Sequence, residues 1–127
     1  MPEHVHVLLC PLELEYQVKN IRTALKAPVG RKALKFVRSQ APAFLEQLKD
    51  LQPDGTVQYR FWQRSGGYDR NVFEPRTLLA MIEYIHNNPV RRGLVARATD
   101  WIWSSARYHA GHPRVPIRMD ELPCLDG

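Results

Sequence analysis

Cysteine is scarce in this sequence, and long apolar runs are missing. Its 127 residues include two cysteines, Cys10 and Cys124, which lie far apart and have no metal-ligand spacing. We therefore expect reduced thiols and a cytoplasmic location. No apolar run approaches the roughly 20 residues that a transmembrane helix needs, and no basic region followed by an apolar stretch suggests a signal peptide. We expect neither a disulfide scaffold nor a membrane protein.

Acidic residues are also in deficit. Thirteen Asp and Glu oppose 18 Lys and Arg, which gives a net charge of +5. This excess is compatible with an acidic partner such as nucleic acid, although many basic domains bind none. With 44% hydrophobic residues, the composition is typical of a globular protein. We expect one domain over residues 1–110 and an extended tail over 111–127.

Periodicity and turn residues predict an α+β fold. Apolar spacing and proline positions indicate helices, while alternating and aromatic-rich stretches indicate strands. The helix over 76–88 is the clearest, and Pro89 is expected to end it. The expected strands are 4–9, 57–64 and 68–73, the last two joined by a turn at Gly66-Gly67; the expected helices are 14–26, 28–39, 43–51 and 76–88, with short helical turns up to 109.

Two histidines flank one valine in the first expected strand. Side chains alternate along a strand, so His4 and His6 face one side while Val5 and Val7 face the other. Two imidazoles on one side form half of a metal site. The alternative is an ordinary polar strand face.

The helix over 76–88 carries a second pair of polar residues. Leu78, Ile82 and Ile85 form a stripe that is expected to face the core. Tyr84 and Asn88 are one turn apart on the flank of that stripe. The Asn88 oxygen suits a hard cation such as Mg²⁺ or Mn²⁺, and a tyrosine hydroxyl can attack a phosphate once its deprotonated form is stabilised. Alternatively, Tyr84 borders the core and Asn88 simply ends the helix.

Basic residues recur on the expected helices and after the last one. They are candidates for DNA contact, and a solvated helix face is the alternative. We expect Trp62, Trp101 and Trp103 in the core rather than as stacking platforms for bases. The candidate DNA-binding residues are Lys19, Arg22, Lys26, Arg31, Lys35, Arg38, Arg91 and Arg92.

Four motifs resemble those of one protein family. PEHVHVLL, FWQRSGGYDRNV, EYIHNNPVRRGLV and DWIWSSARYH occur in this order between residue 1 and about residue 109. The chain is similar to the single-tyrosine HUH transposases, and specifically to the REP-associated tyrosine transposases. The histidine triplet alone is a weak signal, whereas all four motifs in sequence are specific.

The resemblance implies a fold and a reaction. The fold is a ferredoxin-like antiparallel sheet covered by helices, with a divalent metal, Mg²⁺ or Mn²⁺, on His4, His6 and Asn88. Tyr84 matches the nucleophile that attacks single-stranded DNA beside hairpins and leaves a 5′-phosphotyrosine and a free 3′-hydroxyl. A second 3′-hydroxyl then reseals the strand, which makes the enzyme a transposase.

Family members carry additional sheet strands before the histidine motif, and this sequence begins three residues ahead of it. We expect an N-terminally truncated domain whose histidine strand lacks neighbours. The alternative function is therefore a remnant that binds DNA hairpins without cleaving them. A hydrolase that uses water ranks last, because the Asp-His continuation of a binuclear site is missing.

Overall fold

The computed structural model describes residues 3–64 and 67–120. The chain divides into two compact units. Unit 1 combines Met1–Cys10 with Arg70–Gly127, and unit 2 is Pro11–Asp69. Helices and a small antiparallel sheet are both present, so the prediction of a mixed α+β chain is confirmed. None of the helices among the described residues has the length and apolar character needed to cross a membrane.

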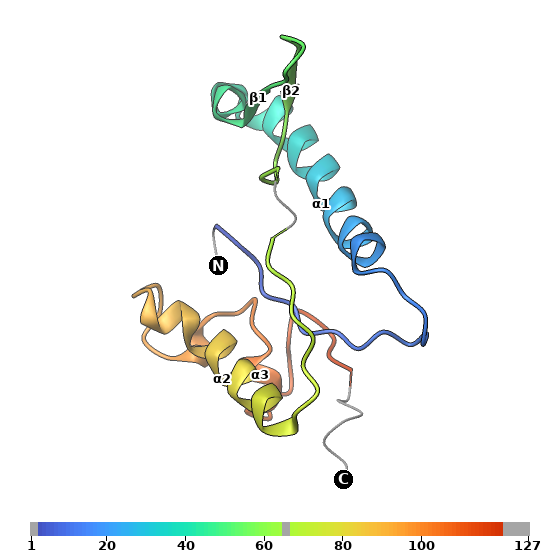
Figure 1. Ribbon diagram of the computed structural model, residues 1–127. Helices are drawn as coiled ribbons and strands as arrows, with labels where there is room; N and C mark the ends of the chain where they lie inside the picture. The colour runs from blue at the N-terminus through green and yellow to red at the C-terminus, as the bar shows by residue number, and fades with distance from the viewer. Residues whose placement is uncertain (1–2, 65–66, 121–127) are drawn as a thin grey trace. The chain divides into compact units, whose positions relative to one another are not determined.

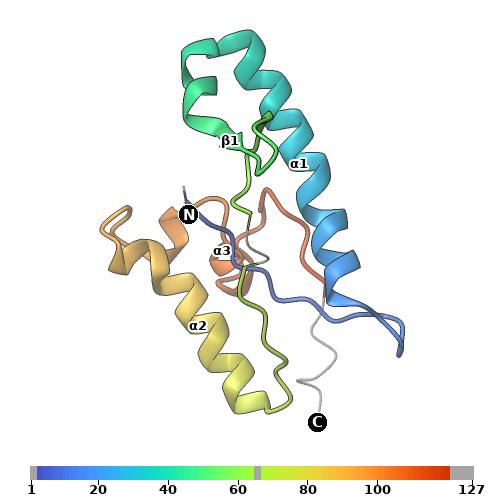
Figure 2. The ribbon, with the colours of Figure 1, turned by 45° about the horizontal axis from the view of Figure 1, so that its top comes forward.

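Unit 2 begins with one long helix, α1 (Val18–Gln40), where the sequence predicted two. Pro28 lies inside α1 and does not interrupt it (Figure 2). A proline removes one helical hydrogen bond, but Trp62 contacts the helix from outside on both sides of Pro28. The indole nitrogen of Trp62 donates to the carbonyl of Lys26 (2.8 Å), and the ring packs on Gly30, where an added Cβ would lie 3.3 Å from it.

The small sheet follows α1 in unit 2. A 3-10 helix, η1 (Pro42–Leu48), leads into strand β1 (Lys49–Leu51), which pairs with β2 (Val57–Tyr59). The turn between the strands contains Asp54, whose carboxylate accepts from the amide and hydroxyl of Thr56, and Gly55, whose φ is +82°. The predicted helix over 43–51 is therefore wrong in its last residues.

The predicted hairpin is also wrong. Its first strand, expected over 57–64, is limited to β2, and residues 68–73 form no strand. Gly66 of the expected turn lies outside the described residues, as does the end of the tail beyond residue 120. The hairpin that forms instead turns at Pro53–Gly55 and uses β1 as its partner strand. A turn with its own Asp side-chain bonds and a left-handed glycine is a stronger local signal than a glycine pair alone.

Unit 1 is centred on α2 (Pro75–Arg91), which extends three residues beyond its predicted end. Pro89 lies within the last turn, and the chain closes the helix after it. The amide of Gly93 donates to the carbonyl of Val90, and that of Leu94 to the carbonyl of Pro89. Gly93 has a φ of +68°. These two bonds and the left-handed glycine form a Schellman motif, which explains why the helix ends here rather than at Pro89.

Short helical turns complete unit 1, as the sequence predicted. They are η2 (Ala98–Asp100) and α3 (Ala106–His109), and η2 contacts both α2 and α3 (Figure 1). The guanidinium of Arg107 donates to the carbonyl of Thr99 (2.8 Å) and ties α3 to η2. Trp103 is 63% exposed, so its predicted place in the core is wrong.

The histidine segment at the start of unit 1 is not a strand. Residues 4–9 have no sheet pairing, and the only sheet of the described ranges is β1–β2. Val5, Val7 and Leu9 are therefore exposed. A strand requires a neighbour for its backbone hydrogen bonds, and this segment has none in the part of the chain that the structure describes. The predicted first strand is wrong for that reason.

Candidate metal and tyrosine site

The two histidines of the N-terminal segment lie together. Their rings meet edge to face with centroids 4.7 Å apart, and the Nε2 atoms of His4 and His6 are 3.0 Å apart. At that distance one of the two nitrogens carries the hydrogen that they share. The two side chains thus point the same way, as expected from alternation, even though the segment is not a strand.

Asn88 joins the histidines from the last turn of α2. Its side-chain amide lies 2.9 Å from Nε2 of His6, across 82 sequence positions. Asn88 is only 8% exposed and is the buried polar residue of the described chain. A buried amide needs a partner, and His6 supplies it. The structure therefore brings together all three residues that the sequence analysis selected as ligands.

The distances from His6 to the other two side chains are compatible with a shared divalent cation. Ligand atoms about 2.1 Å from one ion and at right angles to each other are about 3.0 Å apart. The His4–His6 and His6–Asn88 separations of 3.0 and 2.9 Å match that value. Asn88 directs its amide nitrogen at His6, and a half-turn of the amide would present its oxygen instead.

The protonation of His6 favours ligation. Burial, and secondarily the charge of His4, lowers the pKa of His6 below its ordinary value. His6 is therefore neutral at pH 7, the form in which histidine binds metals. No group of three His, Cys, Asp or Glu side chains that could hold a metal ion gathers among the described residues, so a centre here depends on the amide of Asn88 as its third ligand. His4, His6 and Asn88 are accordingly the set that we carry forward as a candidate metal centre.

Tyr84 lies one helical turn before Asn88 and beside the histidines. Its ring centroid is 5.8 Å from that of His6, and the guanidinium carbon of Arg91 lies 5.7 Å from the tyrosine ring. Tyr84 is 49% exposed and borders an open hollow of about 430 Å³ that Arg91 also lines. A phosphate in this hollow would meet an accessible hydroxyl and the positive charge of Arg91, with the carboxylate of Glu83 also in the lining.

Arg92, a predicted DNA contact, has a partner within unit 1. Its guanidinium lies 3.0 Å from a carboxylate oxygen of Glu3, immediately before the histidines. The ion pair joins the N-terminal segment to the end of α2. Glu3 therefore partly neutralises the positive charge of Arg92.

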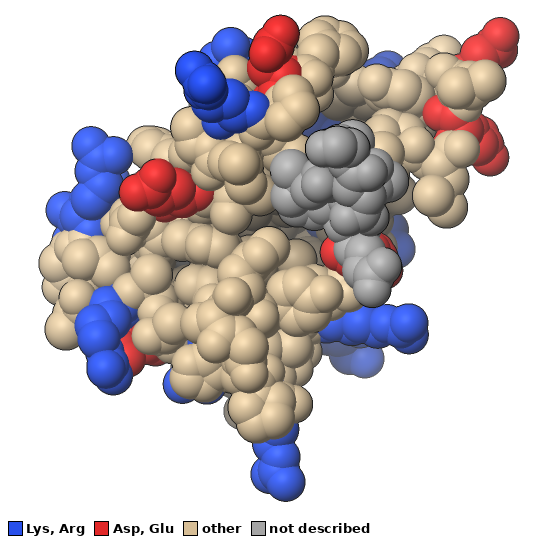
Figure 3. All heavy atoms as spheres, turned by 90° about the horizontal axis from the view of Figure 1, so that it is seen from below, with Lys and Arg blue, Asp and Glu red and all other residues tan. Residues whose placement is uncertain are grey.

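Arg91 is the last residue of α2 in unit 1, and the other predicted DNA contacts lie on α1 of unit 2. Arg22 and Lys26 are half-buried and face the loop after β2. On the face shown in Figure 3, Lys and Arg side chains project as separate groups, with Asp and Glu among them, rather than as one continuous patch. The exposed remainder on α1 are Lys19, Arg31, Lys35 and Arg38.

Sequence reasoning missed a polar contact between α2 and α3. Nε2 of His86 lies 2.8 Å from the hydroxyl of Ser105, and its ring is 5.2 Å from that of His109. Burial, followed by the charge of His109, lowers the pKa of His86. The only sequence signal was the presence of hydroxyl and imidazole side chains in WSSARYH. Their presence alone does not indicate that Ser105 pairs with His86.

Comparisons with known proteins add no family assignment. No model of a known protein family matches the chain, and neither the curated proteins nor the solved structures compared with it give a significant match.

Proposed function

We propose that this chain nicks and rejoins single-stranded DNA beside hairpins, as a transposase of the single-tyrosine HUH class with a ferredoxin-like fold. The observation that supports the proposal is the contact between Asn88 and His6 across 82 positions, next to an accessible tyrosine. The contact satisfies the buried amide of Asn88, and it also places the two histidines beside the tyrosine of the same helix. Tyr84 is the nucleophile, and His4, His6 and Asn88 hold Mg²⁺ or Mn²⁺.

The chain's own residues define the proposed reaction. The Tyr84 oxygen forms a bond to phosphorus, the bond from phosphorus to the 3′-oxygen breaks, and the phenolic proton passes to solvent while the 3′-oxygen is protonated. Arg91 stabilises the negative charge beside the tyrosine. Bound Mg²⁺ or Mn²⁺ would polarise the phosphoryl group. The 3′-hydroxyl of another strand reverses the step and restores free Tyr84.

A covalent adduct is the first test. The wild-type chain is incubated with Mn²⁺ and a DNA hairpin labelled at its 3′ end, the end that stays with the phosphotyrosine, and is then run on a denaturing gel. Tyr84→Phe should lower adduct formation by more than about a hundredfold, because the nucleophilic oxygen is gone. Tyr68→Phe, which removes a hydroxyl from a residue that is 85% exposed, should leave it unchanged. An adduct that persists in Tyr84→Phe contradicts the assignment.

Metal binding is tested separately from cleavage. Electron paramagnetic resonance of free Mn²⁺ measures its affinity without DNA. His4→Ala and His6→Ala should each weaken Mn²⁺ binding by roughly tenfold or more, since each removes a ligand. His112→Ala, which changes an exposed histidine, is the control. If both ligand variants bind Mn²⁺ as tightly as the control, the proposed metal centre is wrong.

The alternative function is a protein that binds DNA hairpins without cleaving them. It is favoured by the exposure of Val5 (63%), Val7 (55%) and Leu9 (50%), because an HUH sheet would cover one side of that segment. A site without this support holds its ligands less rigidly. Under this alternative the gel shows no adduct with wild type at any Mn²⁺ concentration, while the labelled hairpin still binds in a salt-sensitive manner.

A further inference from the structure

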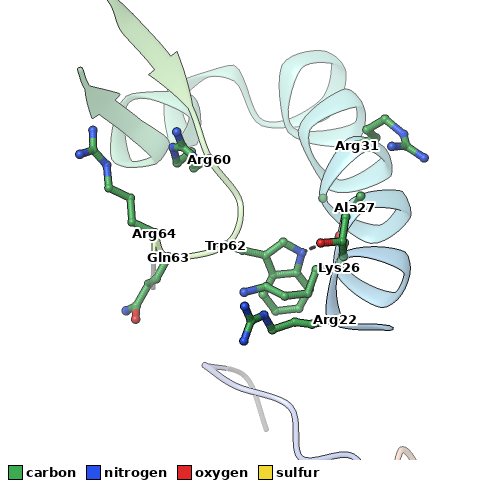
Figure 4. A pocket seen from close by; sticks show the side chains of 10 residues that line it. Arg22, Lys26, Ala27, Arg31, Arg60, Trp62, Gln63 and Arg64 are labelled. Carbon is green, nitrogen blue, oxygen red and sulfur yellow. Dashed lines mark hydrogen bonds between the residues drawn. The ribbon is translucent and has the colours of Figure 1, made fainter. Parts of the chain in front are cut away.

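A basic pocket lies in unit 2, between α1 and the loop after β2. It has a volume of about 400 Å³, and its lining contains five basic side chains and no acidic one. Arg22 and Lys26 lie beside the indole of Trp62, whereas Arg31 points away from it (Figure 4). The other two cations are Arg60 and Arg64.

Trp62 shapes this pocket, and Lys26 lies over its ring. Its nitrogen is bonded to the backbone of α1, its edge packs on Gly30, and the ammonium of Lys26 lies 5.3 Å from the ring centroid. The indole thus fixes the loop against the helix. What the pocket presents to a ligand is positive charge rather than a stacking surface.

The charge in the pocket is only partly balanced. Arg60 and Arg64 both pair with Asp50 on β1, so this carboxylate orients two guanidiniums and neutralises one. Neither Arg22 nor Lys26 has an ion-pair partner among the described residues. Four cations and one anion leave three uncompensated positive charges. An open pocket with this excess of positive charge suits a phosphate group better than an uncharged small molecule.

We infer that this pocket binds a backbone phosphate of a nucleic acid, with Arg22 and Lys26 as the direct contacts and the Asp50-bound guanidiniums of Arg60 and Arg64 at its rim. The choice of hairpin DNA as the nucleic acid rests on the proposed function; the phosphate contact does not. A phosphate contact of this kind carries no sequence information and positions the strand.

The test measures equilibrium binding in the full chain carrying Tyr84→Phe, without metal, so that no covalent step contributes. The probe is a fluorescent DNA hairpin with a single-stranded thymidine tail, followed by fluorescence anisotropy at several salt concentrations. Arg22→Ala with Lys26→Ala should weaken binding by about tenfold and reduce the salt slope by about one to two. The hydrogen bond from Trp62 uses the Lys26 backbone, which alanine retains.

The matched control is Lys32→Ala with Arg76→Ala, which removes the same charge from two exposed positions that are not candidate DNA contacts, one of them on the same helix. Equal losses of DNA affinity in the two double variants would mean that the DNA is attracted by diffuse charge, and would overturn the proposed phosphate contact in the pocket. So would unchanged binding in the pocket variant, or no binding by the Tyr84→Phe chain at low salt. If the pocket variant fails to fold, the charge-conserving pair Arg22→Lys with Lys26→Arg must bind within about threefold of the parent.

Two further outcomes separate the inference from the proposed function. A blunt duplex and an unpaired strand of the same length are used as separate probes, to show whether the bound phosphate belongs to the stem or to the tail. A loss of affinity for either probe that is specific to the pocket variant supports the contact. A wild-type chain that forms no adduct contradicts the nicking reaction, yet leaves this binding comparison intact because it uses neither Tyr84 nor a metal.

Discussion

At the scale of single residues, His86 shows how partial burial makes the stability of the fold depend on pH. Ser105 is its hydrogen-bond partner and His109 its charged neighbour. Because burial and His109 lower its folded pKa below the ordinary value of 6.5, the unfolded chain takes up the proton first as pH falls. The stabilising contribution of neutral His86 is therefore complete above about pH 6.5 and is lost below it.

Chemical unfolding between pH 7.5 and 5 checks this contribution. His86→Gln should make the fall of unfolding free energy with decreasing pH shallower, because one histidine with a lowered folded pKa has been removed. His6 retains a similar dependence, so the slope decreases without vanishing. His112→Gln, at an exposed position, should reproduce the wild-type slope. A wild-type slope in His86→Gln would refute the assignment.

At the scale of elements, local signals predicted which segments are helical better than where they end. The apolar stripe predicted α2, and Tyr84 and Asn88 both lie against His6, as their spacing of one turn implies. At two positions a proline was wrongly expected to separate or end a helix. α1 continues past Pro28 while Trp62 packs against the next turn from outside, and α2 continues past Pro89 until Gly93 closes it. Both contacts depend on residues beyond the proline itself, one of them 34 positions later along the chain.

The strands were predicted less well, because a strand exists only with its partner. The alternating run after Val57 was read as one arm of a hairpin, but the pairing chosen by the chain joins it to residues before Pro53. The candidate site was more predictable than the sheet. His4, His6, Tyr84 and Asn88 were selected from residue types and motif order, and the structure gathers them. Arg22 and Lys26 of the basic pocket were candidates for DNA contact, but the pocket itself was not foreseen, since Arg60 and Arg64 belong to it only through Asp50 and Trp62.

At the scale of the whole molecule, unit 1 is closed by contacts between its two separate stretches of chain. Asn88 meets His6, and Arg92 meets Glu3 across 89 positions. Val37 and Ala106 are the buried hydrophobic residues among the described ones, so little apolar burial supports these polar contacts. We therefore expect the Glu3–Arg92 ion pair to help position the histidines, even though both side chains are more than half exposed.

A charge swap tests this positioning role. Arg92→Glu places two carboxylates together and should weaken Mn²⁺ binding by up to about fivefold, the range open to an exposed ion pair. Glu3→Arg combined with Arg92→Glu restores opposite charges and should recover most of that loss. Arg92→Glu alone adds two negative charges, which by themselves would strengthen Mn²⁺ binding, so a loss of affinity points to the position of the histidines rather than to net charge. Arg76→Glu, at an exposed position near the start of α2, makes the same charge change away from Glu3 and should have a smaller effect. If Arg92→Glu and Arg76→Glu weaken Mn²⁺ binding equally, or if the swap recovers nothing, the ion pair does not hold the histidine segment in place.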